Sequence, residues 1–401
     1  MKKLLIIFLT IAVLLPLYAQ QDDWARKDRS VFTRQYFAFG VDVGVGIANN
    51  FVGRKDIFTK DIVIDMNKIE ESIGDEGIDL YSNLFAETFF SIKNIRIAGG
   101  KWDFDFSSGA EGSLNGNLPK NLVTLISKGN KNEDSFEGTI SVRGTVFGDA
   151  GLGITAKFGR LRVGIRPALY TPLVHIPKSG INYNLDTSEG VSLMANGEVH
   201  IYSPFTENGE LKFGYDLSVN GAYALFPFLD VGGSFSNIPI APSRIQNRMR
   251  ITMADIDNWG FTGQDLIDGK GLDDLNLDFN EEYDTHPIKV LRPLRFDAYL
   301  RLKPFSREIF VLTPNVGFTY DMNDKDRFLN AGLEARLNFI DLFVPYVASG
   351  LDEGLWKHRL GFILNLRAFE LDLEASIQSH DFKESLQMKG FGVNLGFSFG
   401  W

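Results

Sequence analysis

Apolar residues alternate with small or polar residues over long stretches of this chain, and residues 36–47 show the pattern most clearly. Successive side chains of a β-strand point to opposite faces, so a period of two predicts a strand whose two faces differ. One face of this segment is apolar, with Phe37, Phe39, Val41, Val43, Val45 and Ile47. The other is small or polar, with Tyr36, Ala38, Gly40, Asp42, Gly44 and Gly46. Such a segment suits a sheet with one apolar face and one wet face.

The alternation recurs as far as the last residue. On the segment 367–378, the acids Glu370, Asp372 and Glu374 occupy consecutive positions of the polar face. A dry core does not accept adjacent carboxylates without partners, so this face is expected to be wet. Residues 137–158 are either one long strand or a hairpin that turns at Gly148 and Asp149. The segments interpreted as strands are 35–47, 84–92, 95–107, 137–147, 150–158, 160–171, 190–202, 211–226, 228–238, 244–254, 290–303, 308–321, 327–340, 354–366, 367–378 and 388–401.

These strands favour an all-β, transmembrane antiparallel β-barrel over a soluble antiparallel sandwich, whose strands also alternate. Segments of roughly 10 to 14 residues are long for a sandwich and match a tilted membrane crossing. A closed single-chain bacterial barrel usually has an even number of strands, and we predict about 14, with about 16 as the alternative. Beyond residue 19 no apolar run reaches the ~18 residues of a transmembrane helix.

The last strand carries a recognisable pattern. Its residues resemble the C-terminal assembly signal of bacterial outer-membrane proteins, which ends on an aromatic residue with apolar residues at alternate positions. The positions that match are Phe391, Val393, Leu395, Phe397, Phe399 and Trp401, where most of those proteins end in Phe. The resemblance implies outer-membrane lipid and the barrel-assembly machinery as partners.

The first residues have the layout of a secretory signal peptide. Lys2 and Lys3 precede an apolar run from Leu4 to Leu15, and Ala19 offers a small residue for cleavage. We therefore expect a signal peptide over 1–19, a single barrel domain over 20–401, and localisation in the outer membrane of a Gram-negative-type envelope. The chain contains no cysteine, so its stability must come from a source other than disulfides, such as a closed sheet.

Three segments interrupt the strands. Residues 55–74 are predicted to form a short amphipathic helix, and residues 118–128 are a candidate for a second; both would plug or cap the lumen. Residues 255–286 are predicted to be a long acidic loop. Calcium binding by that loop is weighed against a solvated surface loop, which is favoured because the EF-hand spacing is absent.

The residue pattern argues against an enzyme. The five histidines are scattered without ligand-spaced partners, and neither a phosphate-binding glycine loop nor a nucleophile elbow occurs in the required context. We expect no catalytic residues, no metal site and no cofactor. The net charge of −10 gives no electrostatic footprint for nucleic acid.

Charged residues on the polar faces are candidates for the lumen wall. They either form ion pairs that stiffen the barrel or line a path for solutes, and both interpretations remain open. The candidates are Asp42, Arg160, Arg162, Arg166, Arg248, Arg250, Glu334, Arg336, Glu370, Asp372 and Glu374.

Taken whole, the chain resembles the FadL-type group of long-chain fatty-acid transporters. The similarity rests on size, the predicted strand number, short helices near the N-terminus, the terminal strand at Trp401 and the texture of residues 151–177. The chain departs from that group in lacking an Asn-Pro-Ala plug element before the first strand. The resemblance implies passive uptake of a hydrophobic small-molecule ligand, such as a long-chain fatty acid, through a plugged barrel. A general diffusion porin with a charged aqueous lumen and a surface scaffold or adhesin-like barrel are the alternatives.

Overall fold

The computed structural model describes residues 36–51, 53, 66–128, 135–186, 192–205, 210–253, 277–305, 309–339, 341–366 and 368–401. The predicted signal peptide, the first part of the predicted helix 55–74 and most of the predicted acidic loop lie outside these residues. The described part is dominated by strands. Their bounds are β1 (Phe37–Asn49), β2 (Ile78–Ile97), β3 (Gly100–Leu118), β4 (Ser135–Phe158), β5 (Leu161–Asp186), β6 (Ser192–Tyr202), β7 (Gly214–Phe226), β8 (Leu229–Ala241), β9 (Ser243–Met253), β10 (Leu277–Val290), β11 (Leu294–Leu302), β12 (Phe310–Tyr320), β13 (Arg327–Leu337), β14 (Phe343–Asp352), β15 (Leu355–Asn365), β16 (Phe369–Ser379) and β17 (Gly390–Gly400).

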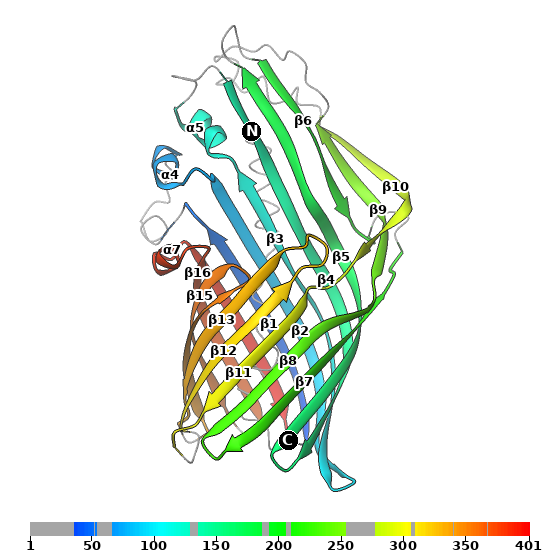
Figure 1. The fold of residues 1–401 in the computed structure, drawn as a ribbon, viewed down its shortest axis with the longest axis vertical. Helices are drawn as coiled ribbons and strands as arrows, with labels where there is room; N and C mark the ends of the chain where they lie inside the picture. The colour runs from blue at the N-terminus through cyan, green and yellow to red at the C-terminus, as the bar shows by residue number, and fades with distance from the viewer. Residues whose placement is uncertain are drawn as a thin grey trace.

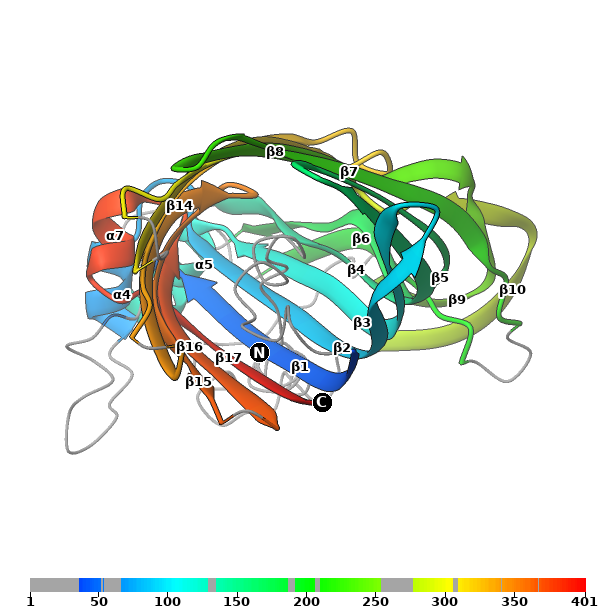
Figure 2. The same cartoon turned by 90° about the horizontal axis from the view of Figure 1, so that it is seen from below.

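Fourteen of these strands form a closed antiparallel barrel (Figure 2). The ring closes because β1 pairs with both β2 and β17, for example through Val43 opposite Leu395 on β17 and Ala86 on β2. The predicted fold class, a transmembrane barrel of about 14 strands whose last strand closes on the first, is confirmed. Read around the wall, the ring is β1, β2, β3, β4, β5, β7, β8, β11, β12, β13, β14, β15, β16 and β17.

The remaining strands β6, β9 and β10 extend the wall beyond the ring (Figure 1). Strand β5 makes this extension because its first half, Leu161–Tyr170, pairs with β7, whereas Gly180–Asp186 pairs with β6. β9 then pairs with β6 and with β10. Residues 277–286, predicted as the end of the acidic loop, are therefore part of β10 instead.

Apolar side chains cover the outside of the ring. On β17 the residues alternate between buried and exposed without interruption, and the exposed set consists of the apolar residues Phe391 to Phe399. Leu333 on β13, Val347 on β14 and Leu360 on β15 are likewise about half exposed or more. An exposed apolar surface of this extent on a closed barrel is the surface that a lipid bilayer covers.

The two rims of the barrel differ. The terminal rim carries Trp401 and short turns such as that at Gly99 between β2 and β3, whose φ of +81° favours glycine. The opposite rim, here called the helix rim, carries α4 (Met66–Ser72), α5 (Lys120–Lys128) and α7 (Phe382–Leu386) (Figure 1). Ile69 of α4 and Ile73, directly after that helix, form an apolar cluster with Val123 of α5. No helix in the described ranges is long and apolar enough to cross a membrane.

Several predicted boundaries were wrong. Residues 137–158 belong to one strand, β4, which confirms the long strand of the two alternatives and excludes the hairpin. Strand β14 was missed, because both of its faces carry apolar residues: Val344 and Tyr346 are buried inside while Phe343 and Val347 are exposed outside. Helix α4 lies in the described part of the predicted helix 55–74, and α5 falls within the predicted 118–128.

Candidate functional site

A buried arginine crosses the lumen of the barrel. Arg292 lies in the short segment between β10 and β11, where the chain leaves the sheet. Its guanidinium Nε and Nη2 donate to Glu111 Oε1 on β3 over 2.8 and 2.5 Å, and Nη1 donates to Asp216 Oδ2 on β7 over 3.2 Å. Strands β3 and β11 are not neighbours in the ring, so this contact spans the interior. The Arg292 side chain is only 4% exposed.

A second arginine completes this group. Arg166 on β5 donates through Nη2 to Asp149 Oδ2 at 2.7 Å and to Ser107 Oγ at 2.8 Å, and Asp149 Oδ2 lies 3.7 Å from Arg292 Nη1. Charged side chains buried at this depth persist only when they are paired. We call Glu111, Asp149, Arg166, Asp216 and Arg292 the lumen cluster; it joins β3, β4, β5 and β7 to the segment before β11.

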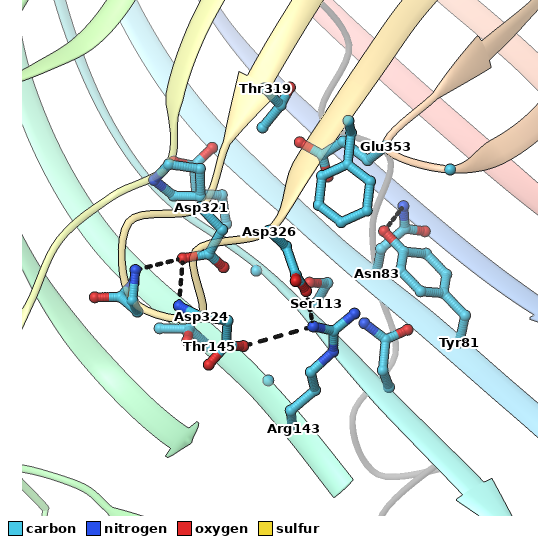
Figure 3. Close-up of a pocket in the computed structure, with 18 of the residues that line it drawn as sticks. Tyr81, Asn83, Ser113, Arg143, Thr145, Thr319, Asp321, Asp324, Asp326 and Glu353 are labelled. Atoms are coloured by element: carbon cyan, nitrogen blue, oxygen red, sulfur yellow. Dashed lines mark hydrogen bonds and ion pairs between the residues drawn. The ribbon is translucent and has the colours of Figure 1, made fainter. Parts of the chain in front are cut away.

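The turn between β12 and β13 makes a second crossing near the helix rim. Arg143 on β4 pairs with Asp326, and its Nη1 lies 3.7 Å from Asp324 Oδ2 (Figure 3). Asn323 of the same turn donates through Nδ2 to the carbonyl of Leu291 at 2.7 Å and accepts from the Leu291 N–H at 2.9 Å. The turn therefore fixes the segment that carries Arg292.

A cavity of about 300 Å³ lies between these two crossings and the inner wall. The inner faces of β2, β3 and β4 form one side, with Tyr81, Asn83 and Thr145 among the lining residues. The start of β11, the β12–β13 turn and the β14–β15 turn form the other. Arg295 at the start of β11 donates through Nη2 to Glu353 Oε1 at 2.6 Å. The lining is rich in charged and hydrogen-bonding groups.

Acids crowd the β12–β13 turn. Burial raises the pKa of Asp324 above its ordinary value, and the neighbouring carboxylates of Asp321 and Asp326 add to the shift, while Arg143 opposes it. Burial is the largest cause of this shift, and the two neighbouring carboxylates are smaller causes. Among the described residues, no group of three or more His, Cys, Asp or Glu side chains is arranged to hold a metal ion.

The structure separates the predicted arginine candidates. Arg166 enters the lumen cluster, and Arg162 occupies the same face of β5 four residues earlier. Arg160 is instead exposed in the turn between β4 and β5 at the terminal rim. Arg248 and Arg250 lie on β9, which belongs to the extension and not to the ring, and their predicted orientation toward the lumen stays a prediction. The side chains of these two residues lie outside what the structure describes.

The remaining candidates occupy the other side of the ring, on strands that contribute nothing to the lumen cluster. Glu370 and Glu374 on β16 are buried, and Asp372 between them accepts a hydrogen bond from the Tyr346 hydroxyl at 3.0 Å. A methyl group built on Gly396 of β17 would lie within 3.2 Å of both the Asp42 and the Asp372 side chains, so these two acids flank that glycine. Arg336 on β13 is buried and Glu334 is partly buried.

Three important residues were missed by the sequence analysis. Arg292, Glu111 and Arg143 stand in or beside segments without clear alternation, and Arg292 is 181 positions away from Glu111. The one local signal was Pro293, since a proline interrupts a sheet and marks the point where β10 and β11 separate.

Comparisons with known proteins agree with this architecture. Residues 31–224 match a family described as a family of unknown function, DUF5723. Among solved structures, the Pseudomonas putida toluene transporter TodX is similar with a TM-score of 0.50 at 9% identity, over 91% of this chain and 89% of that one. A Pseudomonas aeruginosa FadL homologue gives 0.49 at 10% identity over 92% and 90%, and the Ralstonia pickettii toluene transporter TbuX gives 0.44 at 8% identity over 92% and 90%. A search of curated protein sequences finds no match.

The resemblance to FadL-type barrels is thereby confirmed at the level of fold. The chain is a 14-strand transmembrane barrel whose lumen is crossed by Arg292 and by the β12–β13 turn.

Proposed function

We propose that this protein is an outer-membrane transporter that passively takes up hydrophobic solutes, including long-chain fatty acids. The observation that carries the proposal is the double crossing of the lumen by Arg292 and by the β12–β13 turn. A diffusion porin requires a continuous water-filled lumen, and side chains that cross the interior favour the transporter over a porin. The fold similarity to the toluene transporter TodX supports the same class of function.

An interruption in the barrel wall supports a sideways route for apolar solutes. Thr171, Pro172 and Val174 of β5 pair with β4 but with neither β6 nor β7, because β6 ends at Tyr202 and β7 begins at Gly214. Beside this break lies an apolar cluster that includes Phe147, Tyr170 and Ile245, and Phe147 also lines the cavity. In the proposed route, an apolar solute leaves the cavity for the lipid past this apolar cluster.

The proposed orientation follows from this route. The chain is exported by a cleaved signal peptide over 1–19 and assembled with its terminal rim toward the periplasm. Its helix rim and the extension then face the medium, where the solute arrives. No step of this function needs a catalytic group or a cofactor.

The test is uptake by proteoliposomes containing the refolded full-length protein. Saturable uptake of labelled toluene and labelled oleate is expected, while liposomes in an isotonic sucrose or arabinose solution should not swell. Empty liposomes measure spontaneous partitioning of the apolar solutes. Rapid swelling in either sugar, with uptake of toluene and oleate no faster than in empty liposomes, would establish the diffusion porin in place of the transporter.

A further inference from the structure

Residues 291–293 join the extension to the ring and lie outside the strands on either side. β10 ends at Val290, opposite Ser243 of β9, and β11 begins at Leu294, opposite Tyr320 of β12. The middle residue of the segment is Arg292, whose side chain crosses the lumen. Because this segment is not part of the sheet ladder, its position depends on the side chains around it.

Asn323 of the β12–β13 turn holds the segment on one side of Arg292. Its Nδ2 donates to the Leu291 carbonyl at 2.7 Å, and its Oδ1 accepts from the Leu291 N–H at 2.9 Å. A side-chain amide that satisfies both backbone groups of one residue replaces the pair of hydrogen bonds that a neighbouring strand would supply. The N–H of Asn323 donates in turn to Asp321 Oδ1 at 2.8 Å, which fixes the amide within the turn.

Asn237 on β8 holds the segment on the other side. Its Nδ2 donates to the Pro293 carbonyl at 3.0 Å, and the residue is 4% exposed. The pairing of β8 with β7 shifts register around Asn237, whose φ of +60° is left-handed, a conformation that asparagine adopts more readily than most residues. The Asn237 N–H donates to Ser218 Oγ at 3.2 Å. Such an irregularity redirects a side chain from the regular alternation, which brings this amide to Pro293.

The two amides hold the segment from both sides of β11. β8 and β12 are the two neighbours of β11 in the ring, and each side contributes one asparagine. From this position Arg292 reaches Glu111 on β3 and Asp216 on β7. Ordering a long arginine side chain across the lumen costs conformational entropy, and a backbone already fixed in place lowers that cost.

We propose that Asn237 and Asn323 are positioning residues for the Arg292 crossing, and that residues 291–293 are the part that moves when the lumen opens. The inference rests on the proposed function, in which a closed lumen separates a transporter from a porin. The two asparagines act on the backbone beside Arg292, so removing either amide leaves the charged groups of the lumen cluster in place.

Single-channel recordings of the refolded full-length protein in planar bilayers test the proposal. Asn323→Ala removes both hydrogen bonds to Leu291. Asn237→Gly removes the bond to Pro293 and keeps the left-handed backbone, because glycine adopts a positive φ without strain. Arg292→Ala gives the amplitude of openings without the crossing side chain. Asn237→Gly is the milder change and carries the test if Asn323→Ala does not refold.

Two matched controls place the same substitutions away from the segment. Asn338→Ala removes an amide that also donates at 2.7 Å and accepts at 2.9 Å, but with Asp341 of its own turn between β13 and β14. Asn94→Gly changes a second left-handed asparagine, with a φ of +61°, near the end of β2 at the terminal rim. A purely structural effect of losing an asparagine would appear in these controls as well.

The native protein and both controls should be silent or show only brief openings. The fraction of time open should rise about fivefold in Asn237→Gly, for one lost hydrogen bond, and about tenfold or more in Asn323→Ala, for two. These openings should have the amplitude seen with Arg292→Ala. Silence of both positioning variants, or an equal rise in the controls, would overturn the proposal and leave the proposed function standing. Steady, large openings of the native protein would overturn both.

Discussion

At the scale of single residues, Arg292 is the side chain that crosses the lumen and joins strands on its two sides. Its guanidinium is buried among Glu111, Asp149 and Asp216, which come from three different strands. Removing a charge from such a group leaves carboxylates without compensation in a region that water reaches poorly. The sequence reveals the individual charges but not this arrangement, because the partners are far apart in the chain and Arg292 lies at a break between strands.

The first prediction concerns this residue. Arg292→Gln keeps hydrogen-bonding capacity but removes the charge, so the free energy of unfolding should fall by roughly 3–5 kcal/mol, as for a broken buried ion pair. Urea titration of the refolded protein in lipid vesicles, followed by tryptophan fluorescence, measures this loss. Arg160→Gln changes an exposed arginine in a turn and should cost less than about 0.5 kcal/mol. Equal costs for the two variants would show that the lumen cluster does not stabilise the barrel.

At the scale of strands, the alternation of apolar and polar residues predicts best where one face meets lipid and the other meets the lumen. Residues 35–47 and 388–401 were predicted almost as they occur in β1 and β17. Strand β3 was ended at residue 107, whereas it continues to Leu118, because the residues from Ser107 onward carry small or polar side chains on both faces. In the extension, β6 and β9 were predicted as strands at 190–202 and 244–254, whereas β10 was missed.

The second prediction tests the assignment of inner and outer faces on β13. Leu333 is 47% exposed on the apolar outside, and its neighbour Glu334 points to the other face. Leu333→Arg should lower the free energy of unfolding by roughly 2–4 kcal/mol if the position is near the middle of the bilayer, while Glu334→Arg should cost less. Both are measured by unfolding in the same vesicles. Small and equal costs would mean that the face of β13 carrying Leu333 does not meet lipid.

At the scale of the whole molecule, a closed ring of strands is joined across its interior by two sets of contacts. The ring size was predictable, because the number of long alternating segments sets the number of wall strands, even though β14 was missed and β6 and β9 were wrongly included. The crossings were not predictable, because the β12–β13 turn reaches Arg143 on β4 through the interior and no local pattern marks that contact. The crossings by Arg292 and by the β12–β13 turn suit a barrel that admits solutes by rearrangement or through its wall rather than by free diffusion.

The measurement that tests this account most directly is single-channel conductance of the refolded protein in a planar bilayer, with Arg292→Ala recorded in parallel. The native protein should be silent or show only brief, small openings, because Arg292 and the β12–β13 turn both cross its lumen. The Arg292→Ala protein should open more often, because the crossing made by the Arg292 side chain is lost. Steady, large openings of the native protein that Arg292→Ala leaves unchanged would contradict the account, since the lumen would then be open without any contribution from these crossings.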